Sequence, residues 1–346
     1  MLRRFICEVT YRMFQHFYLE ILYLWCIFIR DSFDMTVHIC YSNISKILTI
    51  LWMHDFLHCA PEEGEFMYRS DGYRVHTSDA MYEIVPFIMP KRWDASNSIK
   101  VDIDLEKIQD YTRKCRAKGI KMSHMSILIA AYLRLVSQNP LLNRFAMNKK
   151  IYARNHFCVS FVTLKPGNDT DTVTKVYLNL DDDIFTVNKK VEEAIEKVQV
   201  LEEDNNMDNF MHKLLAVPFL CRGAVGAIKM LDKYFAIPFT LVDISPFHTS
   251  LFVTNLASIR TDTVNHHLYE FGTTGVFISM GKPVKKTYID DEGKAYEKKI
   301  MELGIMTDER IANGHYMGRC FRELDRYLRT LKFWKLRPQR SSGIRM

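Results

Sequence analysis

The chain has 346 residues, of which 48% are hydrophobic and 25% are charged, a composition typical of a globular protein. Its formal net charge is +6, but residues 1–66 hold 5 basic and 8 acidic side chains, and the 21 residues from Arg326 hold seven basic and no acidic ones. The body between them is nearly neutral, which argues against a nucleic-acid-binding surface built into the fold. We interpret residues 332–346 as a solvated basic tail, with contact to anionic lipid or RNA as the alternative.

The cysteines are widely spaced and include no Cys-x-x-Cys pair, so they favour neither a zinc site nor a compact disulfide framework. They are Cys7, Cys26, Cys40, Cys59, Cys115, Cys158, Cys221 and Cys320. Isolated thiols of this kind are typical of a reducing compartment, and we expect a cytoplasmic protein. The apolar stretch at 17–29 is too short to span a membrane and is interrupted by Glu20, so we expect no membrane association.

Residues 1–66 differ in character from the rest of the chain. They contain four of the eight cysteines and no glycine or proline before Pro61. One permitted back-translation of EEGEFM, residues 62–67, places a purine-rich ribosome-binding sequence just before a methionine codon. We therefore interpret residues 1–66 as a translated leader and Met67 as the native start, with a genuine amphipathic extension as the alternative.

From Met67 onward the chain shows regular secondary-structure signals. We expect residues 74–95 to form an extended arm, because Pro86 and Pro90 oppose a long helix. Alternating apolar and charged residues at 98–105 predict a half-buried strand. A helical pattern follows at 104–119 and ends at a glycine, a common helix terminator.

A second helix is predicted to begin after Ser123, a favourable N-cap, and to run to the Asn139-Pro140 pair. It is apolar on almost every side, which indicates that it is buried. The remaining predicted elements are strands at 151–164, 172–180, 248–259, 275–284 and 299–306, and helices at 185–204 and 314–331. Helices alternate with strands without a strict rhythm, so we predict an α/β protein with a mixed sheet covered by helices.

Four stretches, in this order, resemble the chloramphenicol acetyltransferase-like fold, and most closely the acyltransferase cores of 2-oxoacid dehydrogenase complexes. They are VPFIMPKRWDAS at 85–96, SILIAAYLRLVSQNPLLN at 126–143, SLFVTNLAS at 250–258 and MTDERIANG at 306–314. The resemblance covers residues 67–331 and implies a two-layer sandwich. It also implies a bacterial homotrimer with active sites at subunit interfaces, reached by coenzyme A from one side and by the acyl acceptor from the other.

The same resemblance implies roles for particular residues. The hydroxyl that stabilises the tetrahedral oxyanion falls on Thr254, and the side chains that organise the catalytic loop fall on Asn313 and Arg310. The catalytic histidine of the family falls on Glu309, which is a departure from the family pattern. A free glutamate titrates near ~4.3 and a free histidine near ~6.5, so glutamate is the weaker base. Glu309 is interpreted either as a base for a substrate other than a thiol or as an ion-pair partner of Arg310 or a lysine without chemistry.

Histidines elsewhere offer a second candidate base. His266 and His267 are adjacent and fall where the family has a loop that lines its channel. A histidine pair also suggests a metal, but no third ligand stands at a recognisable spacing, so we predict none. His248 and His315 are single histidines, for which packing or surface roles are the ordinary interpretation.

An apolar segment at about 211–247 is interpreted as an insertion, because the family usually has a short connection there. Pro218, Gly223, Gly226 and Pro238 interrupt it, and it is long enough for a helical hairpin. It is interpreted either as additional core or trimer contact, or as a lid over a pocket for an acyl chain or hydrophobic acceptor.

Together these features predict a stand-alone, coenzyme A-dependent acyltransferase that acts on a small thiol, hydroxyl or amine acceptor. Stand-alone action is expected because the chain shows no Asp-Lys-Ala lipoyl hairpin. The alternative is a catalytically inactive trimeric relative with a binding or structural role.

Overall fold

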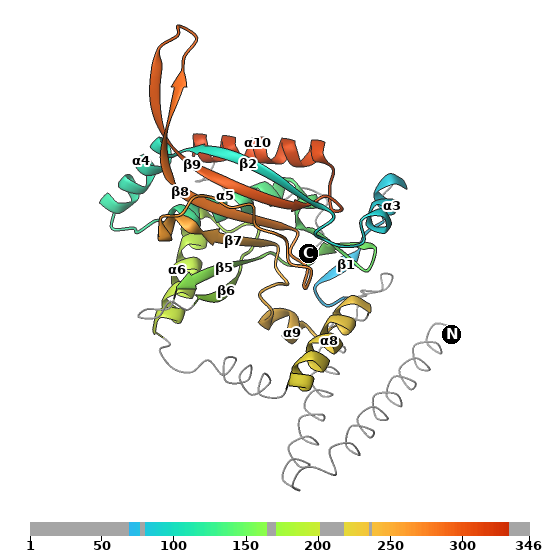
Figure 1. Ribbon diagram of the computed structural model, residues 1–346. Helices are drawn as coiled ribbons and strands as arrows, with labels where there is room; N and C mark the ends of the chain where they lie inside the picture. Colours follow the sequence, from blue (N-terminus) through green and yellow to red (C-terminus); the bar gives the residue numbers. More distant parts are fainter. Residues whose placement is uncertain (1–68, 77–79, 165–170, 201–217, 235–236, 332–346) are drawn as a thin grey trace, which may run out of the picture. The chain divides into compact units, whose positions relative to one another are not determined.

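The computed structural model describes residues 69–76, 80–164, 171–200, 218–234 and 237–331 (Figure 1). The chain divides into two units, Met1–Ala60 and Pro61–Met346, and the described residues belong to the second. The predicted leader at 1–66, the basic tail at 332–346 and the first part of the predicted insertion, 211–217, lie outside the described residues.

The principal element is a six-stranded sheet with the strand order β2-β9-β8-β7-β5-β6. Strand β7 is parallel to both of its neighbours, β5 and β8, and the other pairs are antiparallel. The mixed sheet confirms the predicted α/β class. Its strands are β2 (Ser96–Asp104), β5 (Cys158–Leu164), β6 (Asp171–Tyr177), β7 (Leu251–Asn255), β8 (Val276–Ile289) and β9 (Ala295–Asp308).

A separate three-stranded sheet has the order β1-β4-β3 and was not predicted. Its strands are β1 (Gly72–Arg74), β3 (Arg144–Met147) and β4 (Lys150–Arg154). The prediction of one strand over 151–164 is therefore wrong, because β4 and β5 belong to different sheets. A two-residue hairpin pairs β4 with β3 in the smaller sheet. Its turn residues, Asn148 and Lys149, both have positive φ, at 47° and 60°, which is the backbone conformation such a turn requires.

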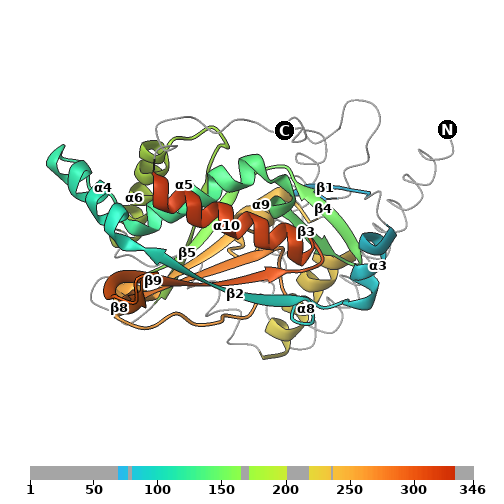
Figure 2. The ribbon, with the colours of Figure 1, turned by 90° about the horizontal axis from the view of Figure 1, so that it is seen from above.

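Four long helices pack on one face of the six-stranded sheet and give the two-layer architecture that was predicted (Figure 2). They are α4 (Leu105–Ala117), α5 (His124–Gln138), α6 (Ile184–Val200) and α10 (Gly314–Thr330). The α5 start confirms the predicted cap, because the Ser123 side chain accepts a hydrogen bond from the Ser126 backbone N–H at 2.9 Å. The other helices are α3 (Ala80–Ile88), α8 (Pro218–Tyr234), α9 (Phe239–Ile244), η1 (Pro140–Asn143) and η2 (Leu256–Ile259).

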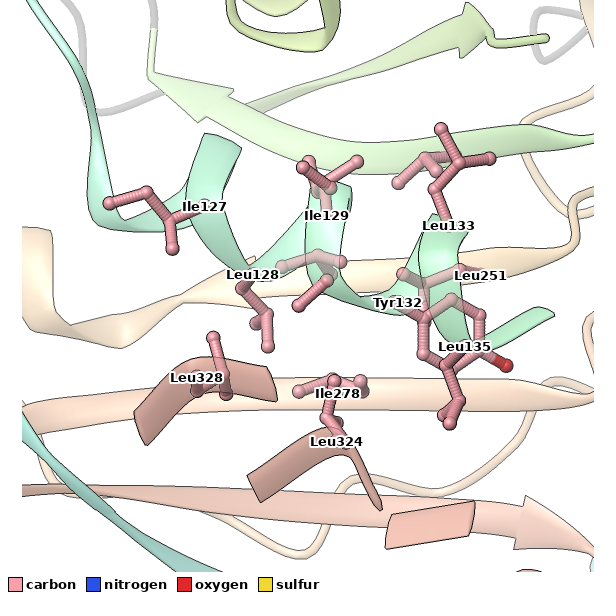
Figure 3. Packing of buried hydrophobic residues seen from close by; sticks show 14 of the residues in the cluster. Ile127, Leu128, Ile129, Tyr132, Leu133, Leu135, Leu251, Ile278, Leu324 and Leu328 are labelled. Carbon is pink, nitrogen blue, oxygen red and sulfur yellow. The ribbon is translucent and has the colours of Figure 1, made fainter. Parts of the chain in front are cut away.

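Helix α5 lies at the centre of the core, as its all-round apolar character predicted. Figure 3 shows Leu128 and Tyr132 of α5 near Ile278 of β8 and Leu324 of α10. All four side chains are at most 1% exposed. Burial of this much apolar surface is the main term that holds the helical layer on the sheet.

The arm predicted as extended contains helix α3, so this prediction is wrong in its central part. Pro86 lies inside the helix, where it removes one backbone hydrogen bond. The helix tolerates that loss because it is nine residues long and ends two residues later.

The strands β8 and β9 are longer than predicted, at 14 residues each, and their outer halves form a hairpin that extends beyond the rest of the sheet (Figure 1). A bulge between Met280 and Pro283 marks the transition. The outer half pairs Tyr288 with Tyr296, whose rings stack with their centroids 5.9 Å apart.

Candidate functional site

The face of the sheet opposite the helices holds the first group of predicted site residues. Val253, Ile278 and Ile305 point to the helical layer, where they join the main core. Because side chains alternate along a strand, Thr254 and its register partner Ser279 point to the other face. Thr254 is half-buried and lies near the carboxyl end of β7.

Ser279 has a structural role beside Thr254. Its hydroxyl donates to the carbonyl oxygen of Val264 at 2.7 Å and lies 2.6 Å from the Thr263 hydroxyl. These bonds hold the 263–268 segment against the sheet face that carries Thr254.

The histidine pair follows on this segment. The His266 ring stacks on Phe277 of β8, with centroids 4.1 Å apart and an interplanar angle of 2°, and its Nδ1 lies 2.7 Å from the His267 carbonyl oxygen. Burial lowers the pKa of His266, so the ring is neutral at pH 7. Phe277 precedes Ser279 by two residues, so the structure brings His266 and Thr254 to the same face.

The second group of predicted residues lies where β9 ends. Asp308 is fully buried, and its carboxylate accepts hydrogen bonds from Arg310 Nε at 2.8 Å and Nη2 at 2.7 Å. Arg92 Nε lies 3.5 Å from the same carboxylate. Arg310 Nη1 also approaches the carbonyl oxygens of Met89 and Pro90, at 3.4 and 3.3 Å, and so ties the residues after α3 to this loop.

Glu309 stands between these paired residues and points elsewhere. Its backbone N–H donates to the Ala95 carbonyl at 2.8 Å, and its carboxylate accepts an exposed hydrogen bond from Asn97 Nδ2 at 3.0 Å. Arg310 directs its guanidinium to Asp308 and not to Glu309. Glu309 therefore does not form the ion pair with Arg310 that the sequence suggested, and its partner is instead the neutral side chain of Asn97 on β2.

Asn313 is exposed and forms the N-cap of α10, where its side chain accepts a hydrogen bond from the Tyr316 N–H at 2.7 Å. His315 is exposed in the first turn of the same helix. The cap explains why the chain changes from strand to helix within five residues of β9.

Within one chain, Thr254 and Glu309 are separated both across the sheet and along the strands. Thr254 is in register with Ser279, and Ser279 is in register with Gly304, five residues before Glu309. Two strand spacings across and five residues along separate the two sites by ~19 Å. A single chain therefore does not bring the candidate base to the candidate oxyanion donor.

A buried polar cluster was not identified from the sequence. It joins Asp232 of α8 to Arg69, whose Nη2 donates to Asp232 Oδ1 at 2.7 Å and whose Nε donates to Asp71 at 2.8 Å. His248 Nε2 lies 3.1 Å from Asp232 Oδ2, and His248 is completely buried. The only signal in the sequence was the single histidine in a strongly apolar segment, because the partners lie up to 179 residues away.

Among the described residues, no group of three or more His, Cys, Asp or Glu side chains is placed to hold a metal ion. No helix in the part of the chain that the structure describes is long and apolar enough to cross a membrane.

No protein-family model and no curated protein sequence matches this chain. Solved structures do match. A probable dihydrolipoamide acetyltransferase of Listeria monocytogenes is 11% identical, with a TM-score of 0.50 over 75% of this chain and 95% of that one. The cubic core of a pyruvate dehydrogenase multienzyme complex is also 11% identical, with a TM-score of 0.50 over 80% and 100% of the two chains.

The dihydrolipoamide acetyltransferase of Azotobacter vinelandii is 12% identical, with a TM-score of 0.50 over 76% of this chain and 95% of that one. Its structure was studied for the role of a serine, a histidine and an asparagine in the catalytic mechanism. Identity this low bears on the fold and not on the activity. The chain has the fold of dihydrolipoamide acetyltransferase cores, the chloramphenicol acetyltransferase-like fold expected from its sequence.

Proposed function

We propose that the protein is a coenzyme A-dependent acyltransferase that works as a homotrimer, with Thr254 of one subunit and Glu309 of the next in one active site. The observation that carries the proposal is the separation of these residues in one chain, two strands across the sheet and five residues along it. Each is half-buried, and neither has the other within reach in its own chain. A neighbouring subunit is the simplest source of the second residue that each active site needs.

An exposed apolar surface beside the Glu309 loop supports such an interface. It lies on and just after α3, which Arg310 ties to the loop through the carbonyls of Met89 and Pro90. Its side chains are between 49% and 65% exposed, and they are Met81, Ile84, Phe87, Ile88 and Trp93. A contiguous apolar patch of this kind is typical of a protein–protein contact.

The spacing of the candidate residues also supports the proposal. The histidine and the asparagine studied in the Azotobacter vinelandii enzyme are four residues apart, as are Glu309 and Asn313 here. In this chain, Glu309 would take a proton from the attacking thiol, hydroxyl or amine while Asn97 holds its carboxylate in place. The Thr254 hydroxyl would donate to the oxyanion that forms when the acceptor attacks the thioester carbonyl.

The proposed reaction needs no metal, because the charge that develops is met by hydroxyl and amide donors. Coenzyme A enters as the acyl carrier and leaves as the free thiol. His266 is a second candidate base, because burial keeps its ring neutral and it lies on the same face as Thr254.

A second candidate function is a trimeric protein of the same fold without turnover. The observation that favours it is Glu309 itself, a weaker base than the histidine expected at this position. It predicts binding of coenzyme A, or of another ligand, with no release of free thiol.

The test is to incubate the full chain with acetyl-coenzyme A and an acceptor. With small alcohols or amines, released coenzyme A is followed with a chromogenic disulfide. With dihydrolipoamide, which loses one thiol for each thiol released, the acetylated product is separated by chromatography and counted as release. We expect Glu309→Gln to lower the rate of release about 10²-fold or more. Glu302→Gln, on the strand that precedes Glu309 but paired with Lys286, is the matched control and should leave the rate unchanged. Equal rates in wild type and Glu309→Gln would remove the base assignment.

Sedimentation of the same sample tests the assembly. We expect a particle of three times the chain mass of 40.7 kDa. A monomer that transfers acyl groups would contradict the shared site, and a trimer with no thiol release from any acceptor would support the inactive alternative.

A further inference from the structure

Three polar side chains outside the Glu309 loop lie within contact distance of one another and form a relay. Ser245 lies in the turn that follows α9, His248 precedes β7, and Asp232 lies in the last turn of α8. Ser245 Oγ is 2.7 Å from His248 Nδ1, and His248 Nε2 is 3.1 Å from Asp232 Oδ2. The two ring nitrogens therefore face a hydroxyl on one side and a carboxylate on the other.

The partners of Asp232 decide which ring nitrogen carries the proton. Burial alone would raise the pKa of Asp232, but the His248 ring and the Arg69 guanidinium together lower it below its ordinary value. An ionised carboxylate only accepts hydrogen bonds, so Asp232, 3.1 Å away, favours the neutral His248 tautomer with its proton on Nε2. The Nδ1 lone pair then faces the Ser245 hydroxyl and can accept its proton.

The relay runs from the interior to the surface. His248 and Asp232 are 0% and 2% exposed, whereas Ser245 is half-buried and follows Ile244, which is 57% exposed. The ammonium of Lys175 lies 2.7 Å from the Val242 carbonyl oxygen and 3.2 Å from that of Ser245. It holds the turn in place and brings a positive charge beside the serine.

We propose that Ser245, His248 and Asp232 form a second acyl-transfer centre, in which Ser245 is the nucleophile, His248 its base and Asp232 the positioning residue. The arrangement of nucleophile, base and orienting group is the one that nucleophilic acyl transfer requires. It is built from α8, α9 and the start of β7, and it uses neither Thr254 nor Glu309. The test of this centre is therefore independent of the test of the proposed function.

The reaction balances without a redox partner. Ser245 Oγ bonds to the acyl carbon of an activated ester or thioester, and the bond from that carbon to the leaving oxygen or sulfur breaks. His248 Nδ1 takes the hydroxyl proton and returns it to the leaving group. Water or an alcohol then attacks the acyl-serine ester with His248 as base, which regenerates the serine and releases the acyl product.

The experiment treats the full chain with a fluorophosphonate, follows the adduct by intact mass and locates it by peptide mapping. We expect one adduct, on Ser245, which Ser245→Ala abolishes. Ser98→Ala, at an exposed serine of β2, and Glu309→Gln should retain it. Asp232→Asn should slow labelling about 10²-fold, because an amide N–H facing Nε2 moves the ring proton to Nδ1.

Because Asp232 also binds Arg69, the fold of Asp232→Asn is checked by thermal unfolding, and the pH dependence of wild-type labelling gives an independent answer. A serine whose proton passes to a side-chain base reaches a rate plateau at high pH, whereas an unassisted hydroxyl gains about tenfold in rate per pH unit, the factor by which hydroxide rises. Three results would overturn the proposal: no adduct on the folded wild type, an adduct on another residue, or a rate that rises without a plateau.

Discussion

The carboxylate of Asp308 and the guanidinium of Arg310 meet through two hydrogen bonds of 2.8 and 2.7 Å, although only one residue separates them. Arg310 is held there with Asp308 fully buried, and Arg92 approaches from the other side. This pairing leaves Glu309 free to turn towards Asn97. The direction of the Glu309 side chain therefore depends on an ion pair to which Glu309 does not belong.

Asp308→Asn should destabilise the fold by about 3–5 kcal/mol, because it leaves two buried guanidinium groups without their common anion. Urea unfolding followed by circular dichroism measures the change. Asp325→Asn, which breaks a largely exposed helical pair with Arg329, is the control and should cost less than about 1 kcal/mol. Equal losses in the two variants would show that the Asp308 pair is not a structural anchor.

Asn97→Ala should lower kcat of the proposed acyl transfer about 10-fold, with KM and stability nearly unchanged, because the Glu309 carboxylate loses the donor that orients it. Steady-state kinetics of thiol release and a melting curve give both readouts. Ser98→Ala, one position along β2, serves as the control. A fall in melting temperature without a fall in kcat would assign Asn97 to stability instead.

Replacing Phe87 and Ile88 by serine should convert the proposed trimer to monomers and abolish thiol release, because these side chains, 60% and 65% exposed, lose the apolar contact that would bury them. Sedimentation velocity measures the assembly. Ile289→Ser, at the outer end of the β8–β9 hairpin and 73% exposed, is the matched control. Trimers that survive the double substitution would place the interface elsewhere.

Gly304→Ala should destabilise the protein by about 1–3 kcal/mol through overpacking. A Cβ at this position would stand 2.6 Å from Ser279 Oγ and 2.8 Å from the Val264 carbonyl oxygen. Gly223→Ala in α8 meets nothing within 4 Å and should stabilise the helix by about 0.5–1 kcal/mol. Thermal unfolding of both variants tests the contrast in sign.

The stability of the fold should fall below pH 6.5 in part because of His156. Burial, with a contribution from the positive charge of Arg154, lowers the pKa of His156 to about 3. As the pH falls, His156 therefore takes up its proton in the unfolded chain before it does so in the folded protein. The contribution of neutral His156 to the free energy of unfolding is complete above pH ~6.5 and is lost as the pH falls towards 3. Between pH 7.5 and 5 this amounts to about 2 kcal/mol.

His156→Gln removes the titrating group and should flatten that part of the stability curve. Urea unfolding of wild type and variant at pH 7.5 and 5 gives the comparison, in which the other titrating groups cancel. The same loss in both proteins would exclude His156 as the source.

Local signals determined most of the main layer correctly. Ser123 caps α5 because its hydroxyl accepts a hydrogen bond from an N–H three residues away. The alternation of apolar and charged residues at 98–105 likewise predicts β2. Both patterns involve residues that are close in the sequence. The motif at 306–314 likewise identified the turn after β9. These features depend on short-range sterics and periodicity, which a single sequence displays.

The tertiary structure alone decided the pairs that bridge long separations. Arg69 reaches Asp232 across 163 residues, and no periodicity in the sequence relates them. The division of 151–164 between two sheets follows from which strands pair, and the turn of Glu309 towards Asn97 follows from β2 lying beside β9. Register and burial are properties of the whole packed chain, because each contact forms only when the remaining elements have closed around it.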